Sequence, residues 1–304
     1  MSLGTRAATA MSGLVGSASG LTAELTSSDA VLRAPLALSR RVGFVQLRGG
    51  AGASATTAYV ANLLARRRTG MVLAVNASAG ERHAVWQAGV AAPPPDPSRP
   101  KRALHRDLAA DRRAHPTSAA DARAGLGVSG SGLYGLDLTG DRLSAGAGSW
   151  LEQVSPIARF YDVVLTDWGV RDRRADLRQV GVTSHVVCLV ARADRYTVEE
   201  AAALVPALQE VEDRPRLVLV LVDVGRTGGP TPALLRRQLS VPVVTIPYEP
   251  LQAAEQPPGS RRLPAPFRLA GIRLARAILT EAQHPELRQR SLTALGRSVA
   301  EARP

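Results

Sequence analysis

The 304-residue chain has a single cysteine, Cys188, and only 4% of its residues are aromatic. One cysteine excludes an intrachain disulfide and any metal site built from several thiolates, and it favours a reducing, cytoplasmic location. No apolar run reaches the roughly eighteen residues that a membrane-spanning helix needs. Lysine is almost absent too, with Lys101 as its one copy. Because aromatic residues are scarce, the core must be built from Ala, Val and Leu. Because lysine is nearly absent, the positive charge comes from arginine.

The charge is strongly positive, with a formal net value of +12. Two interpretations stay open. A basic protein can bind an anionic partner such as DNA or anionic lipid. The richness in Arg, Ala, Gly and Pro is also what a GC-rich genome encodes, and the charge would then be ordinary surface charge.

Short Val- and Leu-rich runs of strand length alternate with helical stretches over most of the chain. This alternation predicts an α/β fold with a doubly wound, mainly parallel sheet that is covered by helices on both faces. The predicted strands are 42–47, 71–75, 161–166, 186–190, 217–222 and 241–246, and the predicted helices are 55–68, 197–212, 231–239, 267–281 and 285–300.

The ends of the chain differ from its centre. Residues 1–40 are rich in Ser, Ala and Gly, which predicts a flexible arm with a short helix around 21–32. Residues 41–283 form one predicted domain, in which 91–149 is an irregular crossover with one helix and one strand at 133–138. Residues 284–304 predict a weakly amphipathic C-terminal helix without Trp or Phe, so membrane binding is not expected.

A glycine-rich turn follows the first predicted strand and contains Gly49, Gly50 and Gly52. Glycines at this point let backbone N–H groups surround a phosphate, while a Lys reaches the β- and γ-oxygens and a Ser or Thr holds Mg²⁺. Ser54 stands where the metal-binding hydroxyl belongs, but Ala53 stands where the Lys belongs. The turn thus predicts a phosphate loop that lacks its point charge.

Other segments follow in a set order. An apolar strand leads to Asp167 and has the shape of a Walker B element, whose carboxylate can hold Mg²⁺ through its water shell. The second strand is followed by Asn76 and Ser78, and a later one by Asp223. The last strand ends in Ile-Pro-Tyr-Glu-Pro at 246–250.

Together, these segments resemble the ParA/MinD group of deviant-Walker P-loop ATPases, of the SIMIBI class, over about residues 40–282. The family loop reads Lys-Gly-Gly-x-Gly-Lys-Thr/Ser, and its last core strand commonly ends in Ile-Pro-Tyr-Asp-Pro. The lead-in at 34–42 is similar to actinobacterial members, some of which occur with type VII secretion genes. The resemblance implies ATP with Mg²⁺, face-to-face dimers, and work in chromosome partitioning, septum-site selection or secretion.

The resemblance also assigns roles to single residues. Arg48 aligns with the signature Lys that reaches the partner subunit's nucleotide, and Ala53 with the loop Lys. Asn76 and Ser78 replace two acids, of which the second positions the attacking water. The implied nucleotide-binding positions are Arg48, Gly49, Gly50, Gly52, Ala53, Ser54, Ala55, Asp223 and Pro247; the implied Mg²⁺ ligands are Ser54 and Asp167; and an active enzyme would use Arg48 and Asp167 in catalysis.

These losses bear on catalysis, because phosphoryl transfer depends mainly on positioning and charge stabilisation. Losing one such donor costs on the order of 10²–10³ in rate, and here a Lys and the switch acids are lost together. We therefore predict a degenerate protein with poor or no ATP hydrolysis that positions or regulates through protein contacts, and nucleotide binding stays open. It would act as a homodimer or with an intact paralogue, whose ATP Arg48 would reach. The alternatives are an active ParA/MinD-type ATPase and a non-specific DNA-binding partition protein.

Overall fold

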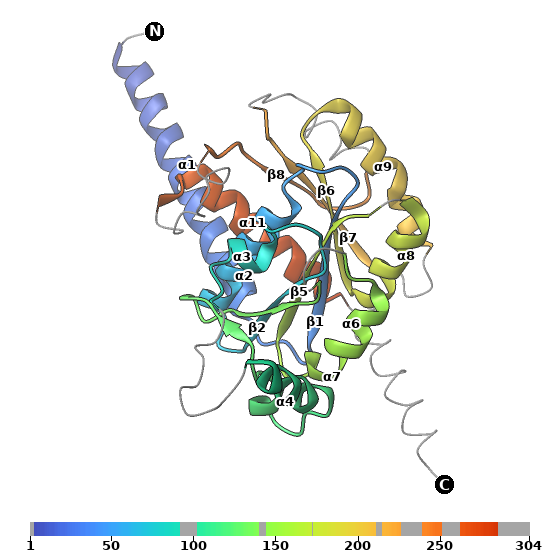
Figure 1. Ribbon diagram of the computed structural model, residues 1–304. Coiled ribbons are helices and arrows are strands. Elements are labelled where there is room, and N and C mark those ends of the chain that lie inside the picture. The colour runs from blue at the N-terminus through green and yellow to red at the C-terminus, as the bar shows by residue number, and fades with distance from the viewer. Residues whose placement is uncertain are drawn as a thin grey trace.

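The computed structural model describes residues 3–91, 102–139, 144–171, 173–210, 215–225, 239–250 and 262–284. At its centre is an eight-stranded sheet with the order β3-β4-β2-β5-β1-β6-β7-β8, in which only β3 and β4 pair antiparallel (Figure 1). The strands are β1 (Arg40–Gln46), β2 (Val72–Asn76), β3 (Gly127–Val128), β4 (Tyr134–Asp137), β5 (Val163–Val170), β6 (Val186–Arg192), β7 (Arg216–Val222) and β8 (Val243–Ile246).

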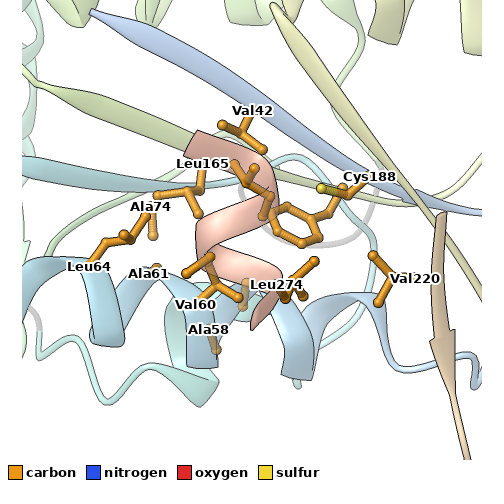
Figure 2. Close-up of a cluster of buried hydrophobic side chains, with 14 of the residues drawn as sticks. Val42, Ala58, Val60, Ala61, Leu64, Ala74, Leu165, Cys188, Val220 and Leu274 are labelled. Carbon is orange, nitrogen blue, oxygen red and sulfur yellow. The ribbon is translucent and has the colours of Figure 1, made fainter. Parts of the chain in front are cut away.

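Helices cover both faces of the sheet, and each face has its own apolar core. Figure 2 shows the first core, where Val60 and Leu64 of α2 and Leu274 of α11 lie against sheet residues such as Leu165 and Cys188. The first face carries α2 (Ala53–Arg67), α3 (Ala84–Gln87) and α11 (Ala265–Ala282), with α1 (Leu3–Arg33) packed on α2 and α11; the second side carries α4 (Arg102–Ala114), α5 (Ala119–Ala122), α6 (Ala147–Gln153), α7 (Ser155–Ala158), α8 (Arg173–Thr183) and α9 (Arg195–Gln209).

The predicted doubly wound, mainly parallel sheet is confirmed, because the six predicted strands and the further strand at 133–138 all form and join one sheet. The helices predicted at 55–68, 197–212 and 267–281 are confirmed within a few residues, as α2, α9 and α11. The helix at 285–300 and nearly all of that at 231–239 lie outside the described residues. Within the described ranges, no helix is long and apolar enough to cross a membrane.

Two predictions for irregular regions were wrong. The short helix expected around 21–32 is a 31-residue helix, α1, which two ion pairs fix to the domain: Arg273–Glu24 at 2.5 Å and Arg67–Asp29 at 2.6 Å. The crossover at 91–149 holds α4, α5, β3, β4 and the start of α6 rather than one helix and one strand. Strand β3 has two residues, too few for side-chain periodicity to reveal it. The boundaries at 40 and 283 stay a prediction.

Candidate functional site

The glycine-rich loop connects the end of β1 to the start of α2 at the carboxyl edge of the sheet, where ligands bind in open α/β folds. Gly50 and Gly52 have φ values of +78° and +90°, in the left-handed region that glycine adopts without strain. A Cβ added to Gly52 would lie 3.3 Å from Cγ1 of Val222, at the end of β7. The end of β7 thus lies close to the loop and limits its shape.

The last residue of β1, Gln46, fills part of this loop with its own side chain. Its Oε1 accepts a hydrogen bond from the backbone N–H of Ala53 at 3.1 Å, and the pair is buried. The N–H groups in the first turn of a helix have no intrahelical acceptor, which is why phosphates bind there. Here a carboxamide oxygen takes that place. Ala53 itself is fully buried and adds no charge.

Asp167 on β5 is the buried centre of the site. Donors face both of its oxygens: Gly169 N–H on Oδ1 at 3.0 Å, Ala84 N–H on Oδ2 at 3.1 Å, and Ser78 Oγ 3.2 Å from Oδ2. The Ser54 hydroxyl is a further donor. Burial raises the pKa of this carboxyl, and the hydrogen bonds from Ser54, Ala84, Gly169 and Ser78 oppose that rise. The predicted juxtaposition of Ser54 and Asp167 is present.

Strand β5 does not end at Asp167, as the sequence predicted, but continues to Val170. The pairing of β1 with β5 shifts register after Phe44, so that Trp168 becomes an extra residue and Gly169 still pairs with Val45. Gly169 has φ +63°, and a Cβ there would come within 2.4 Å of Ser78 Cβ. The bulge therefore brings the backbone after Asp167 against the segment that follows β2.

Arg171 places a buried cation behind Asp167, and sequence analysis missed it. Its Nη2 donates to the carbonyl oxygens of Ala77 at 2.9 Å and Ala145 at 2.7 Å, and its guanidinium lies 5.3 Å from the Trp168 ring centre. Burial lowers the pKa of Arg171, while Asp176 and Asp167 oppose that shift. Part of the positive charge near this site is thus bound in the fold.

Asn76 and Ser78 stand where the family has acids, and both are occupied by the chain itself. Asn76 Oδ1 accepts from Ser78 N–H at 3.0 Å, and its Nδ2 donates to Asp137 Oδ1 at 2.8 Å. Asp137, at the end of β4, also lies 3.6 Å from Nε2 of His83. Sequence analysis did not single out Asp137, which brings a half-exposed carboxylate to this end of the site.

Arg48 is bound within its own chain. Its Nε lies 2.9 Å from Glu200 Oε2, its Nη2 donates to the Tyr196 hydroxyl at 3.0 Å, and the guanidinium lies 5.0 Å from the Tyr196 ring centre. Glu200 raises the pKa of Arg48 through a hydrogen bond and by charge. These contacts hold Arg48 against α9. Nothing in the loop sequence signals them, because Glu200 lies 152 residues away.

The remaining predicted residues lie at the same edge. Asp223 follows β7, where its N–H donates to Ile246 O at 2.9 Å and its Oδ1 accepts from Gly225 N–H at 3.2 Å. Pro247 follows the neighbouring β8. Gly49 lies within the loop, and Ala55 lies in the first turn of α2. The fold therefore gathers the predicted nucleotide positions along one edge of the sheet.

In this arrangement the described residues do not fit a magnesium nucleotide. An ionised carboxylate offers about four acceptor sites, and the backbone N–H groups of Ala84 and Gly169 use two of them at Asp167. The Ser78 hydroxyl lies 3.2 Å from Asp167 Oδ2 and 2.9 Å from Asn76 Oδ1. Gln46 already occupies the Ala53 N–H. A bound Mg²⁺ or phosphate would have to displace these partners. Because position 53 is Ala and not Lys, no positive charge at that position offsets the cost of displacing them.

No family model matches the chain, and no curated protein matches it either. Solved structures do. A ParA family ATPase from Chlorobium tepidum aligns with a TM-score of 0.53 at 18% identity over 81% of this chain and 98% of that one. The septum site-determining protein MinD from Pyrococcus horikoshii, complexed with Mg-ADP, gives 0.52 at 18% over 78% and 94%. MinD in the MinC:MinD cell division complex of Aquifex aeolicus gives 0.50 at 18% over 80% and 94%. With its eight-stranded sheet and its glycine loop at the carboxyl edge, this chain has the fold of the ParA/MinD P-loop ATPases.

Proposed function

We propose that this chain is a degenerate, actinobacterial-type member of the ParA/MinD group that acts in positioning or regulation through protein contacts, with poor or no ATP hydrolysis. The hydrogen bond from the Ala53 N–H to Gln46 Oε1 carries the proposal. A donor that is satisfied inside the fold gains little by exchanging its partner for a phosphate. Asp167 supports the same conclusion for Mg²⁺, because both of its oxygens already accept hydrogen bonds from backbone N–H groups of the chain.

The structural neighbours suggest which activity can persist. The MinD from P. horikoshii is complexed with Mg-ADP, and the MinD from A. aeolicus is complexed with MinC. Binding to another protein needs a surface, whereas hydrolysis needs charged groups that this chain has replaced. A homodimer, or a heterodimer with an intact paralogue, is the form in which we expect it to act.

Calorimetric titration of Mg·ATP tests the proposal on four full-length proteins: wild type, Gln46→Ala, Ala53→Lys and the double variant. We expect no binding heat from wild type and clear binding from the double variant, because it frees the loop N–H and restores the charge. Thr69→Lys adds the same charge at an exposed position beyond α2 and should not bind. Thermal unfolding confirms that each variant is folded. Micromolar binding by wild type would refute the proposal.

A working ATPase is the second candidate, and Asp137 is the observation that favours it. Its carboxylate lies 2.8 Å from Asn76 Nδ2, close to the position of the lost switch acids. In that case, phosphate release by the wild type would be measurable and would disappear in both Asp137→Asn and Asp167→Ala. DNA binding, suggested by the +12 charge, would show as retardation that weakens steeply with added salt.

A further inference from the structure

An apolar groove of about 890 Å³ lies between α1, α2 and α11. We call it the α1 groove. Leu21 and Leu25 form its α1 wall and are 43% and 38% exposed, which is high for leucine. Leu63 of α2 and Leu269 and Ile272 of α11 continue the apolar lining, and the groove also carries charged side chains, namely Asp29, Arg66, Arg67 and Arg268. A groove between helices with an apolar lining is the shape into which another helix packs.

The wall of the groove is fixed to the domain. Arg273 donates to both carboxylate oxygens of Glu24, at 2.5 and 2.8 Å, and Arg67 bonds Asp29 at 2.6 Å. Leu32 is buried, and its carbonyl accepts from Arg68 Nη1 at 2.8 Å. The C-terminal half of α1 is therefore held in place, and the groove is a feature of the folded domain.

The N-terminal half of α1 extends away from the sheet and the other helices (Figure 1). It spans residues 3–20, which at about 1.5 Å per residue is roughly 27 Å of helix. The three-and-four spacing of Leu21 and Leu25 continues through its sequence at Ala18, Leu14 and Met11, and Arg6 is its one charged residue. Such a stripe is the pattern of a helix that packs on another helix.

This half of α1 also has little reason to be helical by itself. Residues 3–20 include Gly4, Gly13, Gly16 and Gly20, and each interior glycine costs about 1 kcal/mol relative to alanine. A Cβ added to Gly20 would meet nothing within 4 Å, so its own chain does not require a glycine there. Helices of this kind gain their stability mainly from tertiary packing.

We propose that the α1 groove is a homodimer interface, which residues 3–20 of a second copy fill. Because α1 is continuous from Leu3 to Arg33, its N-terminal half cannot turn back into the groove that its C-terminal half lines. Among the described residues no other segment fills the groove, and a second copy of the chain carries both halves. With the two α1 helices antiparallel about an axis near Leu21, each copy fills the other's groove, as a two-fold interface requires.

Sedimentation velocity of the full chain without nucleotide tests this dimer. We expect twice the monomer mass of 32.0 kDa for wild type. The variant L21E/L25E puts two carboxylates in the groove at exposed positions and should be monomeric. The matched control, A23E/A30E, adds the same charge at exposed positions on the opposite face of α1 and should stay dimeric. A monomeric wild type, or an L21E/L25E protein that stays dimeric, would overturn the proposal.

Disulfide cross-linking places the contact on α1. Cys188 is fully buried, so Leu21→Cys supplies the accessible thiol. Mild oxidation should give a covalent dimer with Leu21→Cys and none with Ala30→Cys, and Arg48→Ala should leave the cross-link unchanged. Monomers in all cases would point to a helix from a different protein as the occupant and would reject the homodimer. This dimer does not depend on the proposed function, because calorimetry reports on the loop alone.

Discussion

The phosphate loop and the α1 groove differ in how completely the chain satisfies its own groups. At the loop, Gln46, Asn76 and Asp167 all have partners in the same chain. In the groove, Leu21 and Leu25 remain 43% and 38% exposed. A polar group that already has a hydrogen-bond partner gains little free energy by exchanging it for a ligand. An exposed apolar side chain gains free energy when a partner buries it, so the groove can contribute more to binding than the loop. The phosphate loop is the most recognisable motif of the sequence, yet the α1 groove is the surface that can gain more free energy on binding.

The largest expected effect is on stability at the polar site. Asp167→Ala would leave the N–H groups of Ala84 and Gly169 without their acceptor in a fully buried position, whereas the Ser78 hydroxyl keeps Asn76 Oδ1 at 2.9 Å. Each unpaired buried donor costs about 1–3 kcal/mol, so we expect a loss of about 2 kcal/mol or more in the free energy of unfolding. Urea unfolding measures it.

The matched control for that variant is Asp137→Ala, at a carboxylate whose side chain is 38% exposed. Its loss should be clearly smaller, because water replaces part of what is removed. Equal losses in the two variants would mean that the network around Asp167 does not hold the site together, and the contrast between loop and groove would fail.

Much of the fold follows from the sequence, because strand-length runs of Val and Leu leave few alternatives to a covered parallel sheet. The proximity of Ser54 and Asp167 was predicted as well, since a carboxylate at that strand tip lies beside the phosphate loop, but the contact of Ser78 with Asp167 was not. The chain's own occupation of the loop was not predicted. Gln46 was visible as a polar residue at the end of an apolar strand, but whether its amide turns toward Ala53 depends on geometry.

Other parts had no usable signal. The contact between Arg48 and Glu200 joins residues 152 positions apart, and periodicity carries no information about such pairs. The length of α1 was missed because its many Gly, Ser and Thr residues have weak helix propensity, and because the ion pairs of Glu24 and Asp29 that hold it are tertiary contacts.

The next effect appears in acid and lies at the opposite, amino edge of the sheet. His185 Nδ1 accepts from the Arg41 N–H at 3.1 Å, and burial, with Arg41 and Arg40, lowers the pKa of His185 from 6.5 to about 3. The unfolded chain therefore binds the extra proton between these values, and stability is lost as the pH falls from about 6.5 towards 3. The slope contributed is at most about 1.4 kcal/mol per pH unit.

His185→Asn should flatten that acid limb, because the amide oxygen can still accept from Arg41 without titrating. Unfolding free energies measured between pH 4 and 7 check this, with His115→Asn at an exposed histidine as the control that should follow wild type. Asp167 acts with the opposite sign: its raised pKa gives stability that is present at low pH and lost as the pH rises. A limb unchanged in His185→Asn would assign the acid sensitivity to other groups.

The smallest effect is expected for Arg48→Ala. This variant tests whether Arg48 contacts a second molecule or only residues of its own chain. Arg48 is exposed, and its ion pair with Glu200 is of the surface type that contributes little to stability. We therefore expect an unchanged unfolding midpoint and, because the α1 groove lies elsewhere, an unchanged sedimentation coefficient. Glu200→Gln removes the same ion pair from the other side and should behave identically. If Arg48→Ala alone dissociated the dimer, Arg48 would reach across an interface at the loop, and the carboxyl edge rather than α1 would be the contact surface.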